Sequence, residues 1–247
     1  MPATPAWPPK SLPRLFVRQA LSEGASIDLD EKQANYLGNV LRLGAEAELL
    51  VFDGLSGEWL AKIAEAGKKR MTLTVDRKTR EPESIPDVWL AFAPVKRAQI
   101  DWLVEKATEL GAARLVPVMT HRTVAERVRL DRLESIAIEA AEQCGRTRVP
   151  EIVEPVQVNR FVAELDRERH FYFADEGGGE PVAAVFREGP VVILVGPEGG
   201  FTDEERTFVR GTGATPISLG PRILRAETAA LAALSAFMAL AGDWRSY

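Results

Sequence analysis

Two glycine-bearing segments in the last quarter of the chain have residue types suited to holding a small ligand. They are Leu194-Val195-Gly196-Pro197-Glu198-Gly199-Gly200-Phe201 and Leu219-Gly220-Pro221-Arg222-Ile223-Leu224-Arg225-Ala226-Glu227-Thr228. Glycine lets a backbone adopt positive φ and approach a ligand closely, so main-chain N–H and C=O groups can bind its polar edge. Leu194, Leu219, Ile223 and Leu224 would supply apolar walls, although the first two, at strand ends, fit the core equally well.

Each segment connects a predicted strand to a predicted helix. Val191 to Val195 is too short for a helix and rich in β-branched residues, so it predicts a buried strand. Thr202 and Glu205 then have the spacing of a capping box. The second unit repeats this order with a strand at 215–219 and a helix from about 227 to 241, ended by Gly242. Both segments therefore open onto the carboxyl edge of a parallel sheet, where α/β proteins bind small ligands.

The same alternation extends back through the second two-thirds of the chain. Further strands are predicted at 88–93, 115–118 and 170–174, and helices at 100–110, 130–144 and about 181–186. Regular alternation indicates a parallel sheet covered by helices on both faces.

A different pattern precedes the stretch from Thr79 to Asp87, which has two prolines and four charged residues and marks a domain boundary. We place the first domain at residues 1–82 and the second at 83–247. Asp30 and Gln33 predict a capped helix running to about Leu43, among short strands at 15–17, 47–52, 58–63 and 71–75. This pattern indicates a small β-barrel of PUA-like, OB-type or SH3-like form.

Composition limits the classes of function. The net charge of −5, from 31 Lys+Arg against 36 Asp+Glu, disfavours a protein that coats nucleic acid indiscriminately. Phosphate contacts depend instead on local basic clusters, which occur at 68–70, 77–80, 96–97 and 122–132. A proline-rich Met1 to Pro13 without an apolar stretch, the lack of a run of about 18 apolar residues and a single cysteine predict a cytoplasmic protein with no membrane partner. The two histidines and lone Cys144 predict no metal site.

Several further motifs occur in order along nearly the whole chain: Val40-Leu41-Arg42, Phe52-Asp53-Gly54, Lys106-Ala107-Thr108-Glu109-Leu110-Gly111 and Glu142-Gln143-Cys144-Gly145-Arg146. Together with the two glycine segments, they resemble the RsmE-type ribosomal RNA uridine methyltransferases of the SPOUT superfamily. The chain departs from the family at Asn35-Tyr36, where a histidine pair is frequent.

The resemblance implies an α/β fold with a SPOUT-type knotted parallel sheet, a trefoil knot near the C-terminus and a small N-terminal PUA-like β-barrel. It implies a homodimer that uses S-adenosyl-L-methionine to methylate N3 of a uridine in the decoding region of 16S ribosomal RNA. It gives 16S rRNA or the small ribosomal subunit as partner, and no DNA. The alternatives are a SPOUT methyltransferase acting on tRNA or a ribose 2′-hydroxyl, and a non-catalytic RNA-binding assembly factor.

Carried onto this sequence, the resemblance implies a cofactor site built from the two segments. Its residues are Leu194, Val195, Gly196, Pro197, Glu198, Gly199, Gly200, Leu219, Gly220, Arg222, Ile223, Leu224 and Arg225.

Methylation at N3 requires loss of the N3 proton, and the resulting anion places charge on the flanking carbonyl oxygens. A cationic donor would stabilise that charge, and Arg225 is the first candidate, with Arg222 second. Glu109 and Glu198 are candidate general bases. Glu227 is a third, and each has a competing structural role. Glu109 fits a helix end, Glu198 fits a residue that holds its loop through backbone hydrogen bonds, and Glu227 fits a carboxylate that stabilises the first turn of a helix.

Overall fold

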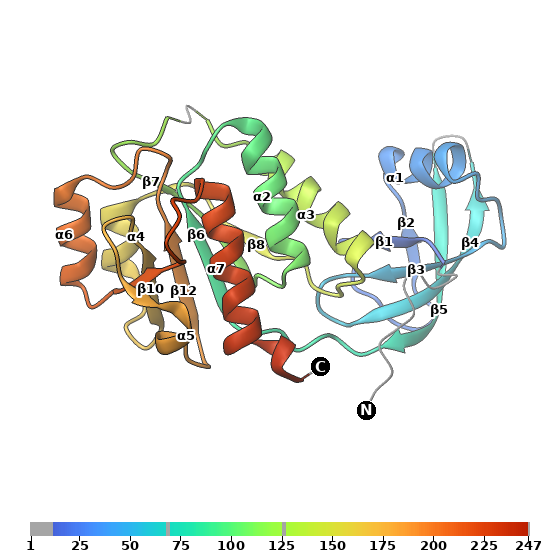
Figure 1. Cartoon of the computed structure of the whole chain (residues 1–247). Coiled ribbons are helices and arrows are strands. Elements are labelled where there is room, and N and C mark those ends of the chain that lie inside the picture. The colour runs from blue at the N-terminus through green and yellow to red at the C-terminus, as the bar shows by residue number, and fades with distance from the viewer. Residues whose placement is uncertain (1–11, 68–69, 125–126, 247) are drawn as a thin grey trace. The chain divides into compact units, whose positions relative to one another are not determined.

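The computed structural model describes residues 12–67, 70–124 and 127–246. Most of the N-terminal segment tested for a signal, and Lys68-Lys69 of the first basic cluster, lie outside these ranges. The chain divides into two compact units (Figure 1). The first contains residues 1–83 and 142–148, and the second contains residues 84–141 and 149–247.

The first unit is built on a five-stranded sheet with the order β1-β3-β4-β5-β2. Its strands are β1 (Arg14–Phe16), β2 (Ser26–Asp28), β3 (Glu48–Phe52), β4 (Glu58–Ala66) and β5 (Met71–Arg80). The β1–β3 pair is parallel and the other pairs are antiparallel. Fully buried side chains from the strands, including Leu49, Ile63 and Leu73, form its core.

One helix covers part of this sheet, as the sequence predicts, but with a different end. The capping box of Asp30 and Gln33 is present at the start of α1 (Glu31–Asn35). The helix then changes to a π-helical turn, η1 (Tyr36–Val40), which ends at Val40 with Leu41 as its C-cap rather than at about Leu43. The buried side chain of Leu37 anchors this turn in the core.

Residues 142–148, which include the Glu142 to Arg146 motif, belong to the first unit although they follow it by some sixty residues. Arg14 donates to the carbonyl oxygens of Glu142 (3.0 Å) and Arg146 (2.7 Å), and Arg80 donates to that of Gly145 (2.5 Å). Both arginines pair with the buried carboxylate of Glu58, at 2.7 and 3.2 Å. Glu58 therefore orients the two guanidinium groups that hold the motif in place.

The second unit contains a parallel sheet with the order β11-β13-β10-β12-β6-β7-β8, and β9 pairs with β7. Its strands are β6 (Val88–Phe92), β7 (Arg114–Met119), β8 (Glu151–Ile152), β9 (Val156–Gln157), β10 (His170–Ala174), β11 (Glu180–Pro181), β12 (Val191–Val195) and β13 (Thr215–Ser218). The predicted strands of this unit are all confirmed, whereas the two-residue strands β8, β9 and β11 were not predicted.

Helices cover both faces of this sheet (Figure 1). One face packs against α2 (Arg97–Glu109), α3 (Leu130–Cys144), α5 (Val182–Val185) and α7 (Ala226–Leu240). The other packs against α4 (Val158–Glu164), which was not predicted, and α6 (Asp203–Gly211). A short 3-10 helix, η2 (Asp243–Ser246), follows α7.

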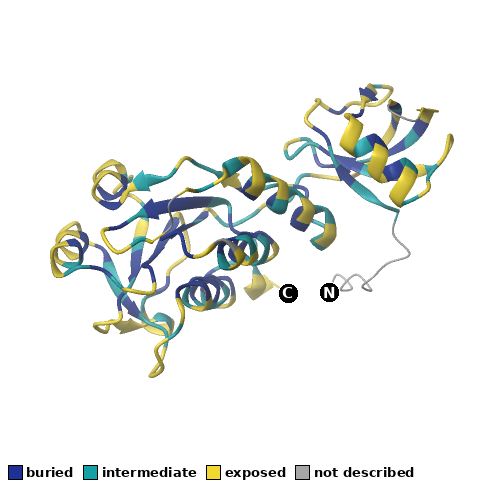
Figure 2. Cartoon of the chain, turned by 90° about the horizontal axis from the view of Figure 1, so that it is seen from above, coloured by how far each residue is buried: buried dark blue, intermediate teal, exposed yellow. Residues whose placement is uncertain are grey.

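Strand β12 shows how the two faces are filled. Val191, Ile193 and Val195 pack on the α2 and α7 side, and Val192 and Leu194 pack on the α4 and α6 side. Successive side chains of a strand point to opposite faces, so a strand buried on both sides is apolar throughout. Figure 2 shows the central strands of this sheet as buried and the outer sides of the helices as exposed.

The segment Ala226–Ser246 is long and apolar enough to cross a membrane by length and composition. Half of its most apolar stretch is buried within the protein, and α7 packs against α2, β12 and β6. Its apolar composition is therefore explained by its position in the core.

We expect Glu58→Ala to lower the free energy of unfolding by roughly 3 to 5 kcal/mol, because it leaves the guanidinium of Arg14 without its buried carboxylate. The matched control is Glu48→Ala, which removes an exposed ion pair with Lys62 at 3.7 Å and should cost less than about 1 kcal/mol. Urea unfolding followed by circular dichroism measures both. Equal losses in the two variants would contradict the role given to Glu58.

Candidate functional site

The order of the strands brings three loops together at the carboxyl edge of the second sheet. Strand β10 lies between β13 and β12, so the loops that follow these three strands are neighbours. They enclose a cavity of about 460 Å³, a size typical of small-molecule sites. We call it the glycine-loop cavity. Its lining residues are Ala174, Asp175, Glu176, Gly178, Val195 to Gly200, Ile217 to Leu224, Ala226 and Ala229.

The loop after β12 has two glycines that the geometry requires. A Cβ at Gly196 would lie 2.6 Å from the ring of Phe201, which is buried and packs edge-on against Phe173. Gly200 has φ +66°, a conformation that L side chains rarely adopt. A larger residue at either position would therefore displace the loop or its support.

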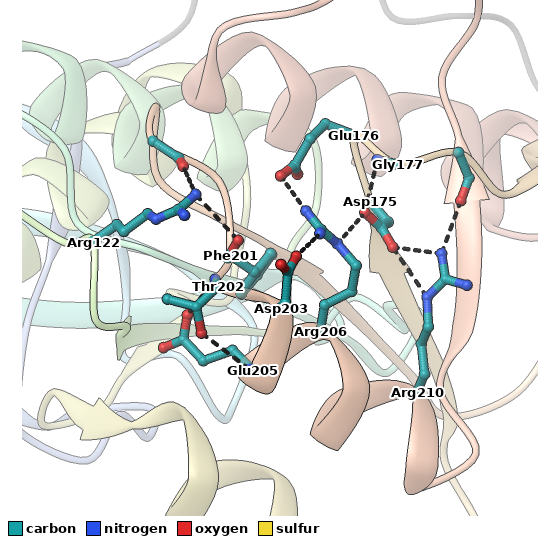
Figure 3. A network of polar contacts seen from close by, with 12 residues as sticks. Arg122, Asp175, Glu176, Gly177, Phe201, Thr202, Asp203, Glu205, Arg206 and Arg210 are labelled. Atoms are coloured by element: carbon teal, nitrogen blue, oxygen red, sulfur yellow. Dashed lines mark hydrogen bonds and ion pairs between the residues drawn. The ribbon is translucent and has the colours of Figure 1, made fainter.

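Strong ion pairs hold the cavity wall formed by the loop after β10 (Figure 3). The fully buried carboxylate of Asp175 accepts from Nε of Arg206 at 3.0 Å and from Nη2 of Arg210 at 2.6 Å. Arg206 also donates to Glu176 at 2.5 Å. Burial alone would lower the pKa of Arg206, but the charges of Asp175 and Glu176 outweigh it and raise that pKa. These pairs fasten α6 to the loop after β10.

The start of α6 is fixed by a second set of contacts. Thr202 and Glu205 form the predicted capping box, and the Glu205 carboxylate also accepts from the backbone N–H of His121 at 2.7 Å. Arg122 donates to the carbonyl oxygens of Gly199 (2.7 Å) and Phe201 (3.3 Å), as Figure 3 shows. The loop after β7 is thus attached to the loop after β12.

A second cavity of about 720 Å³ lies along the same sheet edge, which we call the basic cavity. It is formed by the loops that follow β6 and β7 and by the first turns of α2 and α3. Glu198 and Gly199 line both cavities. The loop after β12 is therefore a wall shared by two adjacent sites.

Comparison with known proteins places the chain in a family. Residues 81–238 match the family model of an RNA methyltransferase domain, and residues 29–76 match that of an RNA methyltransferase PUA domain. Ribosomal RNA small subunit methyltransferase E of Rickettsia conorii is 30% identical over 229 residues, covering 90% of this chain and 93% of the relative. The chain belongs to this family of RNA methyltransferases.

Other members agree over the same length. The enzyme of the same name from Synechocystis sp. is 33% identical, covering 92% of this chain and 77% of the relative. The crystal structure of ribosomal RNA small subunit methyltransferase E from Neisseria gonorrhoeae bound to S-adenosyl methionine superposes with a TM-score of 0.88 and 30% identity, covering 94% of this chain and 99% of that one. The family resemblance and the PUA-like interpretation of the first unit are thereby confirmed.

The structure brings together eleven of the thirteen residues assigned from sequence to the cofactor site. The two exceptions are Leu194 and Arg225. Leu194 lies in the core between the sheet and helices α4 and α6. This agrees with the alternative prediction that Leu194 is a core residue rather than a cavity wall. Arg225 is the exposed N-cap residue of α7. Ile223 is 96% exposed, so it forms the rim of the cavity rather than a buried wall.

The candidate bases lie in three different environments. Glu109 ends α2 and pairs with Lys106 at 2.8 Å, and it lines neither cavity. Glu227 is buried in the first turn of α7. Glu198 is exposed, lines both cavities and forms no ion pair with any described residue.

Sequence reasoning missed the contribution of the loop after β10. Ala174, Asp175, Glu176 and Gly178 line the glycine-loop cavity, yet none of them was assigned to it. A signal was present, because a predicted strand is followed here by two acidic residues and the run Gly177-Gly178-Gly179. Only the strand order shows that this loop adjoins the other two.

We expect Asp175→Asn to lower the free energy of unfolding by roughly 3 kcal/mol, because two arginines lose their buried counter-charge. Asp203→Asn is the control, since its 95% exposed carboxylate pairs with the same Arg206 and should contribute less than about 1 kcal/mol. Thermal unfolding of the two variants measures the difference. A loss in Asp203→Asn as large as that in Asp175→Asn would refute the assignment.

Proposed function

We propose that this protein transfers the methyl group of S-adenosyl-L-methionine to N3 of a uridine in the decoding region of 16S ribosomal RNA. The observation that carries the proposal is the shared loop after β12, which places a cavity for a small cofactor directly beside a larger basic cavity. Membership of the methyltransferase family supports the reaction class. Relatives named for ribosomal RNA of the small subunit support the substrate.

The residues of the glycine-loop cavity suit this cofactor. Gly196, Gly199 and Gly200 line this cavity and let a ligand approach the backbone closely, and Leu219 and Leu224 offer apolar contact for an adenine ring. The carboxylate of Glu198, which forms no ion pair with a described residue, complements a cationic sulfonium. Two similar structures, the N. gonorrhoeae enzyme and a methyltransferase from Legionella pneumophila with 30% identity and a TM-score of 0.87, contain S-adenosyl methionine.

When bound, the cofactor supplies an electrophilic methyl group, and the protein must orient and deprotonate the acceptor. Glu198 is the best placed of the three candidate bases, because it is the one that lines both cavities. Arg225 would donate to the carbonyl oxygens that flank N3 and stabilise the uridine anion. Holding donor and acceptor in line supplies a further part of the rate, up to about 7 to 11 kcal/mol of the barrier.

The fold supports two further features expected of the family. Helix α7 packs against β12 and β6, so the chain after β13 must pass back over the end of β10, and we infer that this passage forms the trefoil knot. Exposed apolar side chains on α2, α7 and η2, namely Trp102, Leu240 and Trp244, would be covered in a homodimer. The first domain, which the sequence places at residues 1–82, would contribute RNA contacts through its PUA domain.

The decisive assay gives the purified protein labelled S-adenosyl-L-methionine and small subunits from cells that lack the gene, followed by nucleoside mass spectrometry. We expect 3-methyluridine in 16S rRNA. Label in a ribose-methylated nucleoside, or in tRNA alone, would assign another member of the superfamily. Failure to bind the cofactor in isothermal titration would leave a non-catalytic assembly factor.

Gly196→Ala is the matched negative variant for that assay. Its Cβ conflicts with the buried ring of Phe201, so cofactor affinity should fall by at least about tenfold, corresponding to 1.4 kcal/mol. Gly211→Ala is the control, because nothing lies within 4 Å of its Cβ position at the end of α6.

We expect Arg225→Ala to lower kcat roughly 100-fold, with little change in cofactor affinity, because its side chain lies outside the cofactor cavity and would act on the uridine anion. The exposed Arg160→Ala serves as the neutral control. Steady-state kinetics and isothermal titration separate the two parameters. Equal losses in kcat and cofactor affinity would show that Arg225 supports the loop instead.

A further inference from the structure

The basic cavity has a composition unlike that of the rest of the chain. Among the residues that the structure describes, five cationic side chains line it against two carboxylates, although the whole protein carries a net charge of −5. The cations are Lys96, Arg122, Arg127, Arg129 and Arg132, and the carboxylates are Asp101 and Glu198. This concentration of positive charge on one sheet edge indicates an anionic ligand.

Neutralisation within the cavity is incomplete. Arg132 pairs with Asp101 at 2.7 Å and Arg129 pairs with Asp131 at 2.6 Å. Lys96, Arg122 and Arg127 form no ion pair with any residue in the described ranges. The two hydrogen bonds of Arg122 go to neutral carbonyl oxygens, so its charge also remains available.

The inner surface of the cavity is apolar. Val95, Ile100 and Leu133 are buried and lie beside the basic side chains. A flipped base is held against aromatic or apolar side chains, and its phosphates pair with cations, so the two kinds of lining together match a nucleotide. The volume of about 720 Å³ is within the range of sites for ligands of this size.

We propose that the basic cavity receives the target nucleotide after it leaves its stack, and that Lys96, Arg122 and Arg127 bind the phosphates beside it. This inference rests on the proposed function, whose acceptor it locates. The base would lie on the apolar surface next to Glu198 and Gly199, the residues shared with the cofactor cavity. Extrusion costs a few kcal/mol, and the phosphate contacts would offset that cost.

Arg122 has a second role in this arrangement. Its stem lies 3.4 Å from the Cβ position of Gly199, and its guanidinium holds the carbonyl oxygens of the loop that lines the cofactor cavity. An RNA phosphate bound by Arg122 would therefore act on the same loop that binds the cofactor. Loss of Arg122 should weaken both ligands, whereas loss of Lys96 and Arg127 should weaken RNA alone.

The test is the double variant Lys96→Ala/Arg127→Ala, with Arg160→Ala/Arg167→Ala as a control of equal charge on exposed positions in and after α4. We expect the KM for 16S rRNA to rise at least about tenfold, with cofactor affinity unchanged. The log–log slope of rRNA affinity against salt should fall by about 1.4, from two phosphate contacts at about 0.7 each. The control should change neither quantity.

The outcomes separate this inference from the function on which it rests. Unchanged KM and salt slope in the double variant, with an active wild-type enzyme, would overturn the nucleotide site and leave the methyltransferase proposal intact. A wild-type protein that binds rRNA but transfers no methyl group would overturn the proposed function. The salt slope would still decide whether these cations bind phosphate. Unchanged cofactor affinity in both double variants shows that they are folded.

Discussion

The position of β12 between β10 and β6 is the constraint on which both cavities depend. Its five residues are buried on both faces, so the strand end at Val195 is held by the largest apolar cores of the second unit. Arg122, from the loop after β7, donates to carbonyl oxygens of the loop that follows β12, and the next helix, α6, is paired with the loop after β10 through Arg206 and Glu176. A shift of this strand would alter both cavities at once, so two cavities with one common wall are a consequence of the strand order.

Polar contacts supply what the apolar core cannot, namely a fixed conformation for glycine-rich loops. Asp175, Glu205 and Arg122 each connect two loops or a loop and a helix, and two of these three side chains are buried. A buried carboxylate is costly unless it is fully paired, so these contacts tolerate few alternative arrangements. Glycine then provides close approach at the ligand, while charged side chains one layer away limit how far the loop moves.

Local signals predicted the elements that position the site, and tertiary contacts decided the rest. The capping boxes at Asp30 and Thr202 involve residues three apart, and the β-branched run of β12 is apolar enough to identify without knowing its neighbours. By contrast, the two-residue strands β8 and β11 exist only because an adjacent strand offers hydrogen bonds. Residues 142–148 belong to the first unit because Arg14 and Arg80 hydrogen-bond to them. A local sequence pattern cannot predict a contact between residues more than sixty positions apart. Leu194 is a residue type expected at a cavity wall, but the pleat of β12 points its side chain to the face of the sheet that packs against α4 and α6.

An acidic net charge and a basic cavity are compatible in an enzyme that must bind one RNA site selectively. At physiological ionic strength, charges interact over a Debye length of about 8 Å. A phosphate is therefore attracted by the cations near it, and the net charge of the whole chain has little effect. Acidic surface elsewhere disfavours non-specific adhesion to RNA, which a uniformly basic protein would suffer. In the proposed arrangement, an RNA would gain the full set of contacts only where it presents phosphates beside a base that can leave its stack. Charge distribution would thus select a structural context, while the wall shared at Glu198 and Gly199 would select the atom that faces the methyl donor.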